Sequence, residues 1–313
     1  MLLRKADTDV TSAVPIRRNR NPFLPRWAMA WPALGWWFVF FVIPLAWIVV
    51  YSFGAKPTPG MQGPVSLSQL SFDNYTSALS DIFFRVFVIT MKTAGIGTIL
   101  CAIVGFPVAY TLALHVPARW RTLLVFLLIL PYWTSFLLRT FAWRIILAPQ
   151  GTLSQALEYL GFITQPLAIL DTNTAVQLGI IYNYLPVMIL PMYVSLDRID
   201  GSLLRASKDL GAGPFRTFWQ VTLPLAAPGI FGGLLLTFIL AAGDYVVPTI
   251  LGGTKGLMVG NLVATQILSA QNLPLGAAMA VLLIILLALV IAVAGLAIFT
   301  VSRSLKLMRG AAL

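Results

Sequence analysis

Long apolar stretches alternate with short polar connectors along this chain. A helix that crosses a membrane needs about 20 mostly apolar residues, and six stretches satisfy that requirement. They lie at residues 28–52, 86–114, 122–147, 174–196, 227–250 and 275–301. The pattern predicts an all-α polytopic membrane protein with about six transmembrane helices.

The composition agrees with lipid as the main solvent. Of the 313 residues, 59% are hydrophobic and only 10% are charged, whereas ordinary soluble domains carry about 25% charged residues. The mean hydropathy is +0.88. We expect one membrane domain over residues 28–301, between a basic tail at 1–27 and a second tail at 302–313. The first apolar stretch is too long, and too rich in Trp and Phe, for a cleaved signal peptide.

The basic residues fall mainly in alternate connectors. Of the 21 Lys and Arg residues, 15 lie in the two tails and in the connectors after the second and fourth stretches. The opposite connectors hold Lys56 and Lys255, with Arg85 at a boundary. Because cytoplasmic connectors carry the excess of Lys and Arg, the asymmetry predicts that both termini are cytoplasmic. An even number of spans agrees with that orientation.

Two short helices are expected on the opposite, outer side. Asp73 is a candidate N-cap for the first, and residues 152–162 form the second candidate. Either helix suits docking of an external protein or ordinary packing at the membrane interface.

The connector at residues 197–224 carries the clearest local signals. Asp200 or Ser202 suits the N-cap of a short helix, and Gly211 suits its C-terminal end. A sharp two-residue turn follows, and Pro214 suits the first position of a second helix. The connector therefore predicts two short helices joined by a tight turn.

The second of these helices is expected to be amphipathic and to end at Pro224, before the fifth span. Its mainly apolar face has the spacing i, i+3, i+4, i+7 and consists of Phe215, Phe218, Trp219 and Thr222. Such a helix can lie on the lipid surface or insert into a groove on a protein partner. The abrupt turn before it favours a rigid knob that contacts a partner.

The spacing of this connector resembles the EAA loop of bacterial ABC-importer permeases. Ala206, Gly211, a gap of nine residues and the ending Val221-Thr-Leu223-Pro224 match the motif. Arg205 and Ser207 depart from it, because the family usually has Glu and Ala there. The resemblance implies a coupling helix that sits in a cleft of a separate ATPase subunit. The residues expected at this contact are Arg205, Ala206, Ser207, Asp209, Gly211, Pro214, Phe215, Phe218, Trp219, Leu223 and Pro224.

Further motifs are similar to the spermidine/putrescine branch of these permeases. They lie at residues 72–75, 131–143, 243–248, 251–253, 260–261 and 273–278. The resemblance implies a type I ABC-importer permease architecture in the bacterial inner membrane, with polyamine cargo. It also implies a second permease subunit, two copies of an ATPase that binds ATP and Mg, and an external periplasmic substrate-binding protein.

Asp244 is the only acidic residue well inside a predicted span. An ionisable residue in hydrocarbon usually faces a cavity or a partner, and a carboxylate with aromatic neighbours suits a charged amine. The expected substrate path comprises Asp244, Tyr245, Tyr132, Trp133, Tyr182, Asn183 and Tyr184. The alternative for Asp244 is an ion pair with Arg139 or Lys92 that fixes helix packing. Arg139 and Arg144 are expected to reach lipid headgroups, or to form a gate or a ridge that meets the binding protein.

No set of residues for catalysis or for a resident cofactor is evident. The chain has no G-x-x-x-x-G-K-[ST] loop for ATP, and its Cys101 and His115 are single, so we expect neither catalysis nor a metal site. The leading hypothesis is the permease subunit of an ATP-driven polyamine importer. One alternative keeps the architecture and changes the cargo to an amino-acid derivative, an opine or a phosphonate. The other is an autonomous channel or ion-coupled carrier.

Overall fold

The computed structural model describes residues 31–57, 63–253 and 256–310. The basic tail at 1–27, the first residues of the first span and Lys255 lie outside the described residues. The chain divides into two compact units, Met1–Trp47 and Ile48–Leu313.

One apolar helix runs over Trp31–Ser52, as the first stretch predicts. It consists of α1 (Trp31–Trp37), a π-helical segment η2 (Phe38–Val42) and α2 (Ile43–Ser52). The widened π turn ends two residues before Pro44, which cannot donate a backbone hydrogen bond. The π segment therefore lets the helix continue through a proline.

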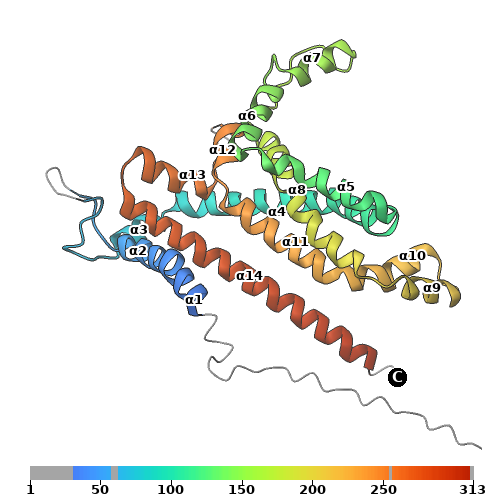
Figure 1. Ribbon diagram of the computed structural model, residues 1–313. Helices are drawn as coiled ribbons and strands as arrows, with labels where there is room; N and C mark the ends of the chain where they lie inside the picture. Colours follow the sequence, from blue (N-terminus) through green and yellow to red (C-terminus); the bar gives the residue numbers. More distant parts are fainter. Residues whose placement is uncertain (1–30, 58–62, 254–255, 311–313) are drawn as a thin grey trace, which may run out of the picture. The chain divides into compact units, whose positions relative to one another are not determined.

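Three helices form the centre of the second unit: α4 (Asp81–Leu114), α8 (Asn173–Asp197) and α11 (Leu223–Gly243) (Figure 1). Small residues allow the helix backbones to approach closely, as is common between membrane helices. A Cβ on Gly233 of α11 would lie 2.9 Å from the carbonyl oxygen of Met188 on α8. Met188 and Ile180 are fully buried in this core. The helices α4 and α8 confirm the second and fourth predicted spans.

The third predicted span, 122–147, is not one continuous helix. The helix α5 (Ala118–Ile129) ends in a 3₁₀ turn η3 (Leu130–Trp133), and α6 (Phe136–Leu147) starts after a bend of 87°. Pro131 is the second residue of the 3₁₀ turn, where its missing N–H and fixed φ suit the first turn of a new helical segment. The described residues thus contain five helices long enough to cross a membrane, or six if the bent pair is one span.

The fifth span starts and ends earlier than predicted. The helix α10 (Pro214–Thr217), the π segment η4 (Phe218–Thr222) and α11 form one helix over Pro214–Gly243. The expectation that Pro224 ends a separate helix is wrong, because the π turn before it removes the need for its N–H. The helix stops at Gly243, and α12 (Val246–Leu251) is separate.

The remaining elements are short helices and the final span. The predicted outer helices are α3 (Asp73–Ala78) and α7 (Thr152–Tyr159). Asp73 is the first residue of α3 and not its N-cap, since Phe72 holds that position and Ser71 Oγ accepts from the Asp73 N–H at 3.4 Å. The chain then forms α13 (Val259–Ala264), the π segment η5 (Thr265–Ser269) and α14 (Leu273–Gly310), whose part Leu273–Val293 corresponds to the sixth span.

Candidate functional site

The helix α9 (Gly201–Asp209) is closed at both ends by local hydrogen bonds. Asp200 Oδ1 accepts from the Ser202 N–H at 2.9 Å, and this bond lowers the pKa of the Asp200 carboxyl group. Asp200, and not Ser202, is therefore the N-cap. At the other end Gly211 has a φ of +77°, a conformation that favours glycine.

Two further bonds complete the C-terminal motif of α9. The Gly211 N–H donates to Lys208 O at 2.9 Å, and the Ala212 N–H donates to Ser207 O at 3.1 Å. This pair of bonds defines a Schellman motif. The predicted stop at Gly211 and the predicted start of a helix at Pro214 are both confirmed.

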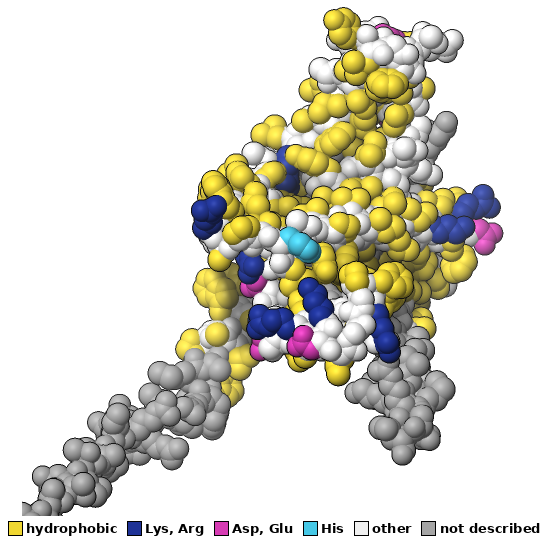
Figure 2. All heavy atoms as spheres, turned by 90° about the vertical axis from the view of Figure 1, so that its right-hand side faces the viewer, with side chains coloured by type: hydrophobic (Ala, Val, Ile, Leu, Met, Phe, Trp, Pro, Cys, Tyr) yellow, Lys and Arg dark blue, Asp and Glu magenta, His cyan; other side chains and the backbone are white. Residues whose placement is uncertain are grey.

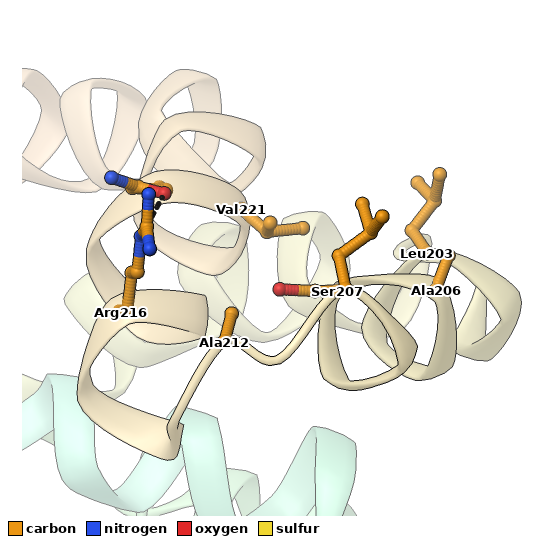
Figure 3. Close-up of a pocket in the computed structure, with 8 residues that line it drawn as sticks. Leu203, Ala206, Ser207, Ala212, Arg216 and Val221 are labelled. Carbon is orange, nitrogen blue, oxygen red and sulfur yellow. Dashed lines mark hydrogen bonds between the residues drawn. The ribbon is translucent and has the colours of Figure 1, made fainter.

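The two helices of the connector enclose a groove of about 410 Å³. A hydrogen bond of 2.9 Å between the hydroxyl groups of Ser207 and Thr217 ties α9 to α10. Arg216 Nε donates to Gln220 Oε1 at 3.1 Å at the edge of the groove (Figure 3). The other lining residues are mostly apolar and comprise Leu203, Ala206, Leu210, Ala212 and Val221. The connector is thus a knob that itself carries a mainly apolar hollow.

The predicted apolar face of the second helix is divided between two directions. Phe215 and Trp219 are 75% and 52% exposed. Phe218 instead packs against two rings of α4, with centroid distances of 5.7 Å to Phe106 and 6.0 Å to Tyr110. Thr222 is also buried. The prediction of a single apolar face assumed regular α-helical spacing. The π segment η4 changes that spacing, so the four residues do not share one face.

The other residues expected at the ATPase contact lie on or next to this knob. Arg205, Ala206, Asp209 and Pro224 are exposed, and Leu223 is half-buried. Figure 2 shows the end of the second unit that carries the knob, where charged side chains gather. An ion pair between Arg121 and Asp197 joins α5 to the end of α8.

A second group of polar residues is buried between the helices. Asp244 links α11 to α12 and is 7% exposed. Its Oδ1 accepts from the N–H groups of Val246 at 2.8 Å and Val247 at 3.3 Å, so it caps α12. Its Oδ2 accepts no direct hydrogen bond from any residue that the structure describes.

Asp244 therefore lies in an irregular link and not within a continuous span. Polar backbone at membrane depth is tolerated where it is buried in protein or lines a cavity. Gly260 of α13 covers this link closely, because a Cβ there would lie 2.9 Å from Asp244 O.

Tyr132 and Asn183 belong to the same polar group. The Tyr132 hydroxyl donates to Asn183 O. The Asn183 side chain donates to Gly179 O at 3.0 Å and to Thr140 Oγ1 at 3.4 Å. Tyr132 reaches α8 because the chain bends directly after it. Thr140 was not predicted, and an isolated threonine in an apolar helix gives no sequence signal for such a role.

Arg139 also lies in this group, which the headgroup hypothesis did not predict. It is 9% exposed, its Nη1 donates to Pro131 O at 3.2 Å, and its Cζ lies 4.6 Å from the centroid of the Tyr132 ring. Among the described residues Asp244 has no ion pair with Arg139 or Lys92. The ion-pair alternative for Asp244 is thus absent from this conformation.

Arg144 has a structural role. Its Nη1 donates to Ile250 O at the end of α12 and lies 3.7 Å from Asp171 Oδ1. The side chain thereby connects α6 with the start of α8 and the end of α12.

Three residues of the expected path are not part of the buried group. Trp133, Tyr182 and Tyr245 are exposed. Tyr182 packs edge-on against Trp143 at 5.3 Å, on another face of α8 than Asn183. Within the described ranges, no cluster of His, Cys, Asp and Glu has the arrangement of a metal site.

Comparison with known proteins gives a consistent result. Residues 105–306 match the family described as "Binding-protein-dependent transport system inner membrane component". The chain is 36% identical over 257 residues to the spermidine/putrescine transport system permease protein PotB of Haemophilus influenzae, covering 82% of this chain and 88% of that protein. The PotB protein of Escherichia coli is also 36% identical, over 260 residues, with 83% and 93% covered.

A solved structure shows the same fold at lower identity. A bacterial ABC transporter involved in the import of the acidic polysaccharide alginate contains a chain that matches with a TM-score of 0.65 and 14% identity, covering 86% of this chain and 93% of that one. The predicted all-α permease architecture is confirmed.

Proposed function

Because the chain belongs to the family of binding-protein-dependent transport system inner membrane components, we propose that it is the permease subunit of an ATP-driven polyamine importer. The observation that carries this proposal is the 36% identity to two spermidine/putrescine permeases over more than four fifths of the chain. The cargo is of the putrescine and spermidine type. The protein is a multi-pass protein of the inner membrane.

The chain works as one part of a complex. A second permease subunit, two copies of an ATPase and an external binding protein complete the importer. ATP and Mg are bound by the ATPase, since this sequence has no Walker A loop. The distribution of basic residues supports an orientation with both termini and the knob in the cytoplasm.

The knob is the proposed contact with the ATPase. Its exposed Phe215 and Trp219 offer apolar area, and its groove offers a recess for a partner side chain. The knob is continuous with α11 through one helix from Pro214 to Gly243. A displacement imposed by the ATPase at Pro214 would therefore move the link at Asp244 as well.

The buried polar group is the proposed inner contact for cargo. Asp244 supplies a buried carboxylate whose Oδ2 has no hydrogen-bond partner among the described residues, and the buried Tyr184 of α8 supplies an aromatic ring. A protonated amine gains from both groups, because the low dielectric of a buried site strengthens the attraction. The external binding protein would set most of the specificity, and Asp244 would act as a weaker second filter.

One observation favours the alternative cargo, an amino-acid derivative, an opine or a phosphonate. Arg139 is a buried cation without an acidic partner among the described residues, and it suits an anionic group of such a cargo. The two hypotheses differ in the charge that the path selects.

Transport by the reconstituted complex tests the proposal. The chain is incorporated into proteoliposomes with its partner permease, its ATPase and its binding protein, and uptake of labelled putrescine and spermidine is measured. We expect ATP-dependent uptake that the chain alone does not support. Uptake of neither polyamine would contradict the cargo, and uptake by the chain alone without ATP would favour a channel or carrier.

A further inference from the structure

The buried polar group contains two opposite charges that do not pair. Asp244 is 7% exposed and Arg139 is 9% exposed. Among the residues described, Asp244 Oδ2 and Arg139 Nε have no hydrogen-bond partner, and neither side chain makes an ion pair. A buried charge without a partner is costly. Each of these two groups therefore gains free energy from any conformation in which it meets an opposite charge.

The two charges belong to helices that pack against each other. The helix α6 carries Arg139 and packs on α12, which Asp244 precedes. Arg144, five residues after Arg139, donates to Ile250 O, six residues after Asp244. The guanidinium group of Arg139 lies over the Tyr132 ring, and the Phe136 ring lies 6.3 Å from the Tyr184 ring of α8. Arg139 and Asp244 thus precede the same contact between α6 and α12, next to one aromatic cluster.

Both charges lie next to breaks in the helices. Arg139 is on the first turns of α6, after the bend of 87°. Asp244 is the link between α11 and α12. Such breaks between helices are where backbone angles change most readily when packed elements move. A modest rotation at either break changes the distance between the charges, whereas the packed cores of α4 and α8 stay intact.

We propose that Arg139 is an alternative counter-ion of Asp244: in a conformation rotated at these breaks its guanidinium group pairs with the carboxylate, and it competes there with a cargo ammonium group. This inference rests on the proposed polyamine function. In the conformation described here Arg139 lies on Tyr132, and Asp244 Oδ2 accepts no hydrogen bond from a described residue. Competition between the two cations lets the path release its cargo, since the guanidinium group replaces the leaving amine.

Polyamine binding to the assembled complex in nanodiscs tests the proposal. The melting temperature of the complex, without binding protein, is measured against putrescine concentration. For Arg139→Gln we expect the half-maximal concentration to fall by about tenfold, the size of a typical coupling between contacting charges. Asp244→Asn removes the response, and the double variant behaves like Asp244→Asn.

Arg144→Gln is the matched control. Arg144 is on the same helix but pairs with Asp171, so its loss should change the melting temperature and not the putrescine dependence. An unchanged or raised half-maximal concentration in Arg139→Gln would overturn the proposal. If this variant does not assemble, Arg139→Lys replaces it. Lys keeps the charge and loses the planar fork, so a decrease of about threefold supports the proposal and no decrease overturns it.

A second measurement separates this inference from the polyamine function. If neither putrescine nor spermidine changes any melting temperature, the cargo assignment fails. The pairing of Arg139 with Asp244 is then tested by a double-mutant cycle on the melting temperatures measured without polyamine. Non-additive effects of Arg139→Gln and Asp244→Asn support pairing of the two side chains. Additive effects overturn it.

Discussion

The hydroxyl groups of Ser207 and Thr217 share a hydrogen bond of 2.9 Å between the two helices of the knob. Thr217 is buried, so this bond fixes α9 on α10 next to the groove, which Ser207 lines. A hydrogen bond of this kind contributes about 1 kcal/mol. The groove keeps its shape only while the two helices stay together.

Removing this bond should loosen α9 and leave the membrane helices unchanged. For Ser207→Ala or Thr217→Val we expect amide hydrogen exchange at residues 210–212 to become about fivefold faster, as a loss of about 1 kcal/mol implies. The double variant should be no faster than the single variants. Ser202→Ala is the control, since no hydrogen bond of its hydroxyl group holds α9 to α10. Equal exchange rates in all variants would contradict the role of the bond.

Gly211→Ala should weaken the coupling between the ATPase and transport. The left-handed conformation of Gly211 costs an L-residue about 1 kcal/mol, while no atom lies within 4 Å of the new Cβ. We expect ATP hydrolysis stimulated by loaded binding protein to fall by about fivefold. Gly213→Ala is the matched control, because Gly213 has a φ of −67° and equally open space. Loss of stimulation in both variants would show that the effect is not conformational.

Trp219→Ala and Phe218→Ala should separate assembly from folding. Trp219 is exposed, and a tryptophan at the centre of an interface contributes about 2 kcal/mol or more, so Trp219→Ala should weaken ATPase binding by about thirtyfold. Phe218 packs against Phe106 and Tyr110, so Phe218→Ala should instead lower the melting temperature of the permease. Binding is measured by titration with the purified ATPase. If the effects of the two variants were exchanged, the proposed contact face would be wrong.

Asp244→Asn should lower polyamine transport without unfolding the link. The Asn side chain can still accept from the Val246 N–H, whereas the charge that attracts an amine is lost. Uptake of labelled putrescine at saturating binding protein should fall by at least about tenfold, the loss expected for a charged contact. Asp244→Ala removes the cap as well and should also lower the melting temperature. Normal uptake in Asp244→Asn would refute a cargo contact at this residue.

Regular patterns in the sequence predict much of the fold. Runs of apolar residues place the second, fourth and sixth spans, and capping residues place both ends of α9, because these signals are local. Structural features that depend on contacts with neighbouring helices are harder to predict from the sequence. The bend after Trp133 and the end of α11 at Gly243 occur inside continuous apolar sequence. Pro224 looks like a helix end, but the π segment η4 accommodates it.

The sequence likewise predicts some contacts of the candidate site and not others. Tyr132 and Asn183, an aromatic and a polar residue in apolar stretches, meet through a hydrogen bond. The substrate path through these residues, Tyr184 and Asp244 stays a prediction. Tyr182 lies one residue before Asn183 and faces another direction, which composition alone cannot show. Arg139 was expected at the headgroups because its distance from the end of the stretch is short. The bend turns it into the protein instead.

The π segment η4 also keeps the two ends of the helix Pro214–Gly243 in angular phase although the helix holds an extra residue. A π segment holds one residue more than the α-helical turn it replaces, so deleting Gln220 would restore a regular turn and leave the knob and Asp244 in nearly the same angular relation. An α-helix advances by about 100° per residue, so deleting a residue from the regular part of α11 would instead rotate the knob by about 100° around the axis relative to Asp244. The direction in which the ATPase pushes therefore tolerates a one-residue deletion in η4 and not in α11.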